Sequence, residues 1–202
     1  MFSNEIDKLI IQHLDDLDDG ARRLTRLQDR VADVIDETFN DWLDAKGWYP
    51  DSGEWRQRQD AAIAPRNWIS EDNKWLAWFG LGFGSGDDGQ PGEEKDYFWL
   101  TRLCKAGRGE MGLRFAQAEV GRTAWKKFLR DQAPRFLGTR FIIDEEPSLF
   151  LPVRIHKDDL ARAVEEEDLK PAFVPLLEAF EYIHENIDRF HSLLAESRKL
   201  QA

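Results

Sequence analysis

Two stretches in the middle of the chain decide its fold class: Lys74-Trp-Leu-Ala-Trp-Phe-Gly-Leu-Gly-Phe83 and Glu110-Met-Gly-Leu-Arg-Phe-Ala-Gln117. Both are rich in aromatic or alternating apolar residues, a pattern typical of strands. Residues 96–105 are a third stretch of this kind and lie between the other two. Glycine-rich connections at 84–92 and 106–109 join the three stretches, and glycine permits the positive φ angles of tight turns. We therefore predict a three-stranded antiparallel meander.

The segments after the meander are expected to return to helix, then to strand, then to helix. Residues 119–132 predict a helix that ends before Pro134, because proline cannot continue the hydrogen bonding of a helix. Residues 140–144 and 148–155 predict a second hairpin. Two further segments are predicted to be helical: 156–168 and 171–200.

The first 44 residues carry apolar side chains at helical spacing. Residues 3–44 therefore predict helix, and Gly20 is expected to split this segment in two. Four of the apolar residues are seven positions apart, the spacing of a coiled-coil seam: Ile10, Leu17, Leu24 and Val31. Two interpretations stay open, a stripe that faces the protein's own core and a seam that joins two copies as a homodimer.

The length of 202 residues gives room for one domain. The chain is 42% hydrophobic and 12% aromatic, which excludes wholesale disorder because disordered chains are poor in the residues that build a core. We expect a single α+β domain over residues 1–202, with an antiparallel sheet of about five strands. It is divided into an N-terminal helical segment (1–44), an aromatic-rich sheet region with one central helix (45–155) and C-terminal helices (156–202).

Charge is distributed unevenly along the chain. The formal net charge of −11 argues against a mainly cationic binder of nucleic acid or of membranes. Residues 1–44 carry a net charge of −7 and residues 137–202 carry −6, whereas residues 45–136 carry +2. Two acidic helical ends therefore flank a mildly basic, aromatic middle. Another protein with a basic surface is the partner that this layout favours.

The compartment and the cofactors are constrained by motifs that the sequence lacks. The N-terminus shows no cationic start followed by an apolar core, and no apolar stretch is long enough to span a bilayer. We therefore expect a cytoplasmic protein without a membrane partner. Cys104 is the single cysteine, which excludes the usual zinc sites built from several cysteines. We expect no metal and no cofactor.

Two short motifs resemble the signature of a known nuclease superfamily: Pro50-Asp51 and Glu93-Glu-Lys95. Together with the expected order of helix, three antiparallel strands, helix and strand, they resemble the restriction-endonuclease-like superfamily, whose members carry Pro-Asp followed by Asp/Glu-x-Lys. The resemblance implies metal-dependent cleavage of phosphodiester bonds, in which carboxylates such as Asp51 and Glu93 hold the cation and Lys95 lies near the attacking water. Here the second motif precedes a predicted strand, whereas in the superfamily it lies within one. The resemblance is therefore compatible with an active nuclease domain or with a degenerate one.

A basic stripe provides one set of candidate binding residues. Arg122, Lys126 and Arg130 are four residues apart in the predicted helix 119–132, so they share one face. Such a face can receive an anionic ligand, nucleic acid or the protein's own acidic helices. Arg108, in the connection 106–109 before the predicted strand 110–117, would extend the stripe.

The eight tryptophans provide a second set of candidates. Tryptophan contributes a large apolar area to a core, and it is also frequent among the residues that dominate binding energy at interfaces. The core interpretation is favoured for most of them. The candidates for exposed anchors are Trp48, Trp55, Trp68 and Trp78.

Three functional hypotheses follow from these patterns. The leading one is a non-enzymatic protein-binding module, of an inhibitor, immunity or regulatory type, that presents acidic helices and aromatic anchors to a partner. The second is a metal-dependent or degenerate nuclease domain of the restriction-endonuclease-like kind. The third is a domain that contacts a ligand or nucleic acid through the basic stripe.

Overall fold

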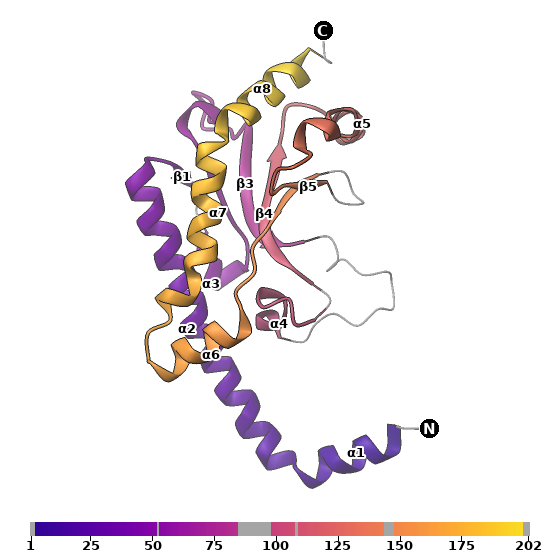
Figure 1. Cartoon of the computed structure of the whole chain (residues 1–202), viewed down its shortest axis with the longest axis vertical. Coiled ribbons are helices and arrows are strands. Elements are labelled where there is room, and N and C mark those ends of the chain that lie inside the picture. Colours follow the sequence, from indigo (N-terminus) through magenta and orange to yellow (C-terminus); the bar gives the residue numbers. More distant parts are fainter. Residues whose placement is uncertain (1–2, 52, 85–97, 108, 144–147, 200–202) are drawn as a thin grey trace.

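The computed structural model of the protein describes residues 3–51, 53–84, 98–107, 109–143 and 148–199. Within these residues the strands form one six-stranded antiparallel sheet in the order β1-β2-β3-β4-β6-β5 (Figure 1). The strands are β1 (Tyr49–Pro50), β2 (Ala61–Ala64), β3 (Ala77–Phe83), β4 (Met111–Gln117), β5 (Ile142–Ile143) and β6 (Leu149–Pro152). The prediction of an α+β fold with an antiparallel sheet is confirmed.

Eight α-helices lie in the part of the chain that the structure describes. They are α1 (Ser3–Gln12), α2 (Leu14–Lys46), α3 (Trp55–Arg58), α4 (Trp99–Leu103), α5 (Arg122–Gln132), α6 (Lys157–Glu165), α7 (Val174–Glu185) and α8 (Ile187–Arg198). The described residues also contain three short 3-10 helices: η1 (Arg66–Trp68) between β2 and β3, η3 (Ala133–Phe136) directly after α5, and η4 (Lys170–Phe173) directly before α7. The expected helical ends and the central helix, α5, are all present. None of these helices combines the length and the apolar composition needed to cross a bilayer.

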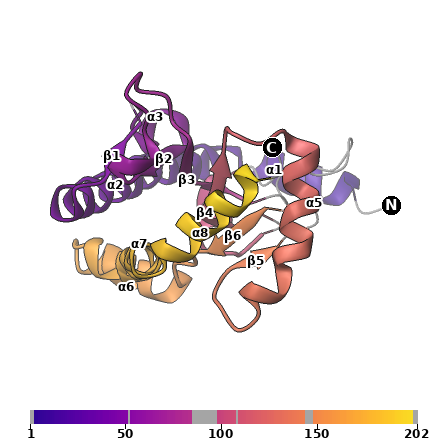
Figure 2. The same ribbon diagram turned by 90° about the horizontal axis from the view of Figure 1, so that it is seen from above.

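Helices α7 and α8 run along one face of the sheet (Figures 1 and 2). Side chains alternate between the two faces of a strand, so the odd-numbered residues of β3 and β4 point toward these helices. Phe79 of β3 and Phe115 of β4 are buried there, and the ring of Phe190 from α8 lies 4.8 Å from each of them. One cluster of buried residues extends from Val31 to Leu194, so the terminal helices share a core with the sheet.

The middle strand predicted for the meander is wrong. Within residues 96–105 the structure has helix α4, and β3 pairs directly with β4 over seven residues, from Ala77 opposite Gln117 onward. Trp99, Leu100 and Leu103 are all buried, and their spacing places them on one side of a single helical turn. The preference of aromatic residues for strands reflects how their side chains pack and is not a property of the backbone. In this stretch the aromatic and aliphatic side chains pack from one side of a helix.

The second hairpin is confirmed, although its strands are shorter than predicted. Strand β5 pairs antiparallel with β6, with Ile142 opposite Phe150. Strand β6 also pairs with β4, which joins the hairpin to the sheet. The region between α2 and β3 contains the edge strand β1, the neighbouring strand β2 and helix α3.

The N-terminal segment is helical as predicted, but it breaks at His13 and not at Gly20. His13 has φ −119° and ψ 29°, which lie outside the helical range, so it separates α1 from α2. Gly20 continues within α2. One glycine costs a helix only about 1 kcal/mol, and the ion pair between Arg22 and Asp18, 2.6 Å apart, spans this turn.

Candidate functional site

Residues 4–23, here called the N-terminal arm, project from the body of the molecule (Figure 1). Every residue from Asn4 to Arg23 is exposed. The arm comprises most of α1 and the first turns of α2. Six of its aliphatic side chains are between 43% and 71% exposed: Ile6, Leu9, Ile10, Ile11, Leu14 and Leu17.

The aliphatic residues of the arm form a face. Residues three or four apart lie on the same side of a helix, so Ile6, Leu9 and Ile10 make one stripe on α1. Leu14 and Leu17 make a second stripe on α2, immediately after the break at His13. Large apolar side chains exposed in a group are characteristic of interaction surfaces, because isolated exposed ones are common but groups are not.

The polar side of the arm is acidic. Residues 4–23 contain six acidic and three basic residues, four of the acidic ones being Asp15, Asp16, Asp18 and Asp19. The ion pairs of Arg22, with Asp18 and Asp19, and the contact of His13 with Asp16 at 3.5 Å all join residues three or four apart. These contacts stabilise the arm as a helix, but they do not fix it against the body.

The second half of α2 is held firmly where the arm ends. Its buried residues lie three or four apart and face the core: Val31, Ala32, Ile35, Phe39, Trp42 and Leu43. The rings of Phe39 and Trp42 lie 5.7 Å and 5.3 Å from the ring of Phe180 in α7. The sequence left two interpretations of the N-terminal periodicity open, a core-facing stripe and a dimer seam. In this half of the segment the apolar stripe faces the protein's own core.

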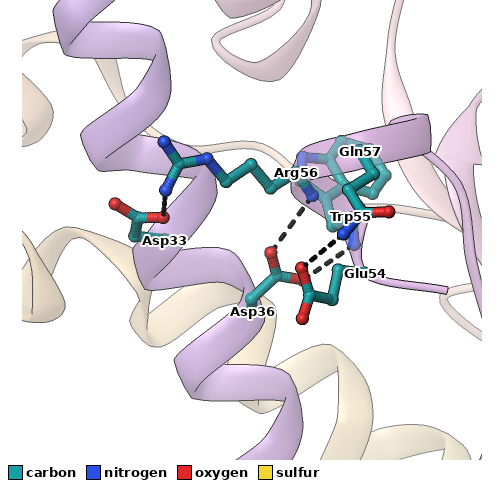
Figure 3. A network of polar contacts seen from close by, with 6 residues as sticks. All are labelled: Asp33, Asp36, Glu54, Trp55, Arg56 and Gln57. Atoms are coloured by element: carbon teal, nitrogen blue, oxygen red, sulfur yellow. Dashed lines mark hydrogen bonds and ion pairs between the residues drawn. The ribbon is translucent and has the colours of Figure 1, made fainter.

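A polar network joins α2 to α3 (Figure 3). The backbone N–H of Trp55 donates to Oδ1 of Asp36 at 2.8 Å, and the N–H of Arg56 donates to Oδ2 at 3.1 Å. A carboxylate that accepts from the first N–H groups of a helix satisfies donors that have no partner within the helix. Burial raises the pKa of Asp36, and these two hydrogen bonds partly oppose that rise. The guanidinium of Arg56 also pairs with Asp33.

A second set of contacts fixes the C-terminal end of α2 to α7. The indole N–H of Trp42 donates to Oε1 of Glu181 at 3.1 Å, and Nζ of Lys46 lies 2.9 Å from Oε2 of the same carboxylate. The hydrogen bond from Lys46 lowers the pKa of Glu181. The arm therefore projects from a helix whose other half is fixed by packing and by contacts between residues far apart in sequence.

The tryptophans chosen as candidate anchors lie mostly in the core. Trp48, Trp55 and Trp68 are only 7%, 0% and 3% exposed. The ring of Trp48 lies 6.2 Å from that of Phe79, so it packs on the sheet. These three side chains are therefore not surface anchors in this conformation, because the residues around them fill the space a partner would need. Trp78 is partly exposed, on the face of the sheet opposite α7 and α8.

The basic stripe has the geometry that the sequence predicts. Arg122 and Arg130 are exposed on α5 and Lys126 is partly buried, while the opposite side of the helix is buried through Trp125, Phe128 and Leu129. That the stripe binds an anionic ligand stays a prediction. Arg108 lies outside the described residues.

Of the three residues of the nuclease hypothesis, the structure describes only Asp51. The Asp51 carboxylate pairs with Arg58 and accepts from the backbone N–H of Ala62 at 3.3 Å, which is a structural role at the edge of the sheet. Glu93 and Lys95 lie outside the described residues. Strand order does not support the resemblance either, since α4 occupies the place of the middle strand. Among the described residues no three His, Cys, Asp or Glu side chains are grouped so that they could hold a metal.

Comparison with known proteins returns no family model, no curated protein and no solved structure that matches this chain. The chemistry of its own residues therefore has to indicate what it does.

Proposed function

We propose that the chain is a non-enzymatic protein-binding module that docks onto another protein through the N-terminal arm. The observation that carries this proposal is the group of six exposed aliphatic side chains on an acidic helical projection. Helices that lie in the groove of a partner use anchors at positions i, i+3, i+4 and i+7, and α1 offers Ile6, Leu9 and Ile10 at the first three of these positions. The cytoplasm remains the predicted compartment.

The chemistry of the partner follows from the two sides of the arm. Its apolar stripe requires a groove lined by apolar side chains, and its aspartates favour lysine or arginine at the rim of that groove. A membrane surface suits the arm less well, since helices that lie in the lipid interface carry Lys and Arg on their polar side and the arm is net acidic.

A second copy of the chain is also a weaker fit than a basic partner. Two acidic arms side by side would repel each other. The seven-residue column that suggested a dimer is also interrupted, because Ile10 and Leu17 lie on opposite sides of the break at His13 and Val31 is buried in the core.

Co-purification from native lysate tests the proposal if arm variants are compared in parallel. The full chain should retain a stoichiometric protein at low salt and lose it as salt rises, because charge attraction is screened. Replacing Leu9, Ile10 and Leu14 by serine should abolish retention. A control with Asn4→Ser and Gln12→Ser changes polar residues of the same arm and should leave retention intact.

Two results would overturn the proposal. In the first, the serine variant retains the partner as well as the native chain does. In the second, the native chain elutes alone at every salt concentration or only as a dimer of itself. Native tryptophan fluorescence in the variant would show that loss of the partner is not loss of the fold of the body, because residues 4–23 contain no tryptophan.

A further inference from the structure

Helices α2 and α7 lie side by side (Figure 1) and leave a groove of about 310 Å³ between them. Each helix lines the groove with residues three and seven positions apart, which share one side of a helix. These residues are Thr38, Asp41 and Ala45 of α2, and Val174, Leu177 and Glu181 of α7. The groove therefore follows both helices for about two turns.

An ion pair joins the two sides of the groove at each of its ends. Next to Thr38, the carboxylate of Glu37 pairs with Lys170, which directly precedes α7 in η4. Next to Ala45, Nζ of Lys46 lies 2.9 Å from Oε2 of Glu181. The two pairs hold α2 and α7 in place on either side, so the groove is already formed in the free protein, as most binding sites are.

The inside of the groove is apolar. Trp42 and Phe173 form its floor and are only 3% and 1% exposed. The indole N–H of Trp42 donates to Glu181, so the floor needs no polar partner. Above the floor, Val174 and Leu177 are 50% and 41% exposed. Exposed aliphatic side chains beside a groove with an aromatic floor are typical of a site that receives an apolar group.

The rim of the groove is acidic. Residues 37–46 and 170–181 together contain five acidic and two basic residues, and both lysines are engaged in the ion pairs at the ends. The other three carboxylates belong to Asp41, Asp44 and Glu178, which are exposed and form no ion pair within the part of the chain that the structure describes. A cation beside the groove is therefore attracted and an anion is repelled.

We propose that this groove docks a short segment of another protein that inserts one large apolar side chain between α2 and α7 and carries arginine or lysine on both sides of it. The inserted side chain would cover Val174 and Leu177, and the cations would face Asp41 and Glu178. Tryptophan and arginine are enriched among the residues that dominate binding energy at interfaces. The arm of a second copy is a poorer occupant, because it is net acidic.

This docking surface is separate from the N-terminal arm, since no residue of 4–23 lines the groove. The proposal goes beyond the function proposed for the arm and does not depend on it. One side chain in a groove binds a short segment weakly, because much of its binding energy is spent on ordering that segment. The groove alone would not retain a protein during purification, so the two surfaces can be tested separately.

Three blocked tripeptides test the chemistry of the occupant: Arg-Trp-Arg, Glu-Trp-Glu and Arg-Ser-Arg, each acetylated and amidated at its ends. They are titrated into the ¹⁵N-labelled full chain, and the indole N–H signal of Trp42 and the amide signal of Leu177 are followed. Arg-Trp-Arg should bind roughly tenfold tighter than Glu-Trp-Glu, the change that two exposed ion pairs provide together. Arg-Ser-Arg should not bind measurably, since it lacks the side chain whose burial drives binding.

Variants of exposed residues locate the binding. Ala45→Phe fills the groove from α2 and should weaken the binding of Arg-Trp-Arg at least about tenfold. Ala21→Phe is the matched control, because it makes the same change at an exposed position of the same helix within the arm, and it should bind as the native chain does. Asp41→Asn should reduce the preference for Arg-Trp-Arg over Glu-Trp-Glu about threefold.

Three results would overturn the proposal. In the first, no tripeptide shifts the Trp42 indole signal at about 5 mM, a concentration that detects even weak sites. In the second, Arg-Trp-Arg and Glu-Trp-Glu bind equally, which would mean that the groove takes apolar molecules regardless of charge. In the third, Ala45→Phe binds Arg-Trp-Arg as the native chain does.

A second variant keeps the test valid if Ala45→Phe disturbs the packing of α2 against α7. Leu177→Ser removes an exposed wall of the groove and should weaken Arg-Trp-Arg binding, whereas Leu14→Ser, at an exposed leucine of the arm, should not. Equal binding by these two variants would also contradict the proposal. Failure of the arm variants in co-purification would leave all of these results unchanged.

Discussion

The two halves of the N-terminal helical segment have the same apolar spacing but differ in burial. In residues 31–43 the apolar side chains are buried against α7 and the core, whereas in the N-terminal arm, residues 4–23, they are exposed. The polar contacts differ in the same way, since Asp36 binds the start of α3 while Arg22 pairs only with aspartates one turn away among its described contacts. Periodicity therefore specifies which side of a helix is apolar, but the rest of the chain determines whether that side is covered.

Hydrogen exchange should separate the two halves most strongly. Isolated helices are marginal in water, so amides of residues 5–20 are expected to exchange at least about a thousand times faster than those of residues 31–43. Mass spectrometry of peptides from the two regions measures the ratio. Equal protection in both regions would mean that the arm is packed against the protein in solution.

Removing one isoleucine from each half compares their contributions to stability. Ile35 is fully buried, so Ile35→Ala should lower the free energy of unfolding by about 2–5 kcal/mol. Ile11 is 71% exposed, and Ile11→Ala should change it by less than about 0.5 kcal/mol. Urea titrations of both variants provide the values, and similar losses would contradict the division into arm and body.

The contact between α2 and α3 allows a narrower comparison, between two aspartates one turn apart. Asp36→Ala removes the acceptor of two backbone N–H groups and should cost about 1–2 kcal/mol of unfolding free energy. Asp33→Ala removes only an exposed ion pair with Arg56 and should cost less than about 1 kcal/mol. If Asp33→Ala costs as much as Asp36→Ala, the backbone contacts of Asp36 are not what holds α3.

A substitution at Gly20 tests whether the arm can be stabilised without changing the stability of the body. Nothing lies within 4 Å of a Cβ added there, so Gly20→Ala meets no obstacle and should favour the local helix by about 1 kcal/mol. Exchange in residues 14–23 should slow, while the urea midpoint of the body stays unchanged. A shift of that midpoint would show that arm and body unfold together.

The smallest expected effect concerns Glu181, whose pKa the hydrogen bond from Lys46 lowers. A carboxyl with a lowered folded pKa stabilises the protein above its ordinary pKa of 4.5, and this contribution is lost as pH falls through the folded value. Native protein should therefore exceed Glu181→Gln in unfolding free energy at pH 7, by less than about 1 kcal/mol, and the difference should shrink as the pH falls below 4.5. A difference that grows on acidification would contradict this assignment.

Much of the fold could be predicted because its elements have strong local patterns. Trp125, Phe128 and Leu129 lie on one side of the predicted central helix, and they are the residues that α5 buries. Alternation predicted β3 and β4 correctly. The aromatic content of residues 96–105 predicts a strand, although the buried side of α4 within this stretch has the spacing of a helix.

The candidate sites were harder to predict than the fold. Whether Trp55 faces solvent or the core depends on Phe83 and Trp99, which are far away in the sequence and lie 5.6 Å and 6.3 Å from its ring. The exposure of the arm has no local signature, because its apolar spacing is the same as that of a buried helix.

The buried aromatic cluster has a consequence for spectroscopy. Residues 4–23 contain no tryptophan, whereas Trp42 and Trp48 lie in the core with their rings 5.2 Å apart. Intrinsic fluorescence therefore reports only on the body, while the helical signal in the far ultraviolet includes the arm. Two optical transitions that do not coincide are the signature of a protein that does not unfold as one unit. In this molecule their difference measures the melting of the arm without any label.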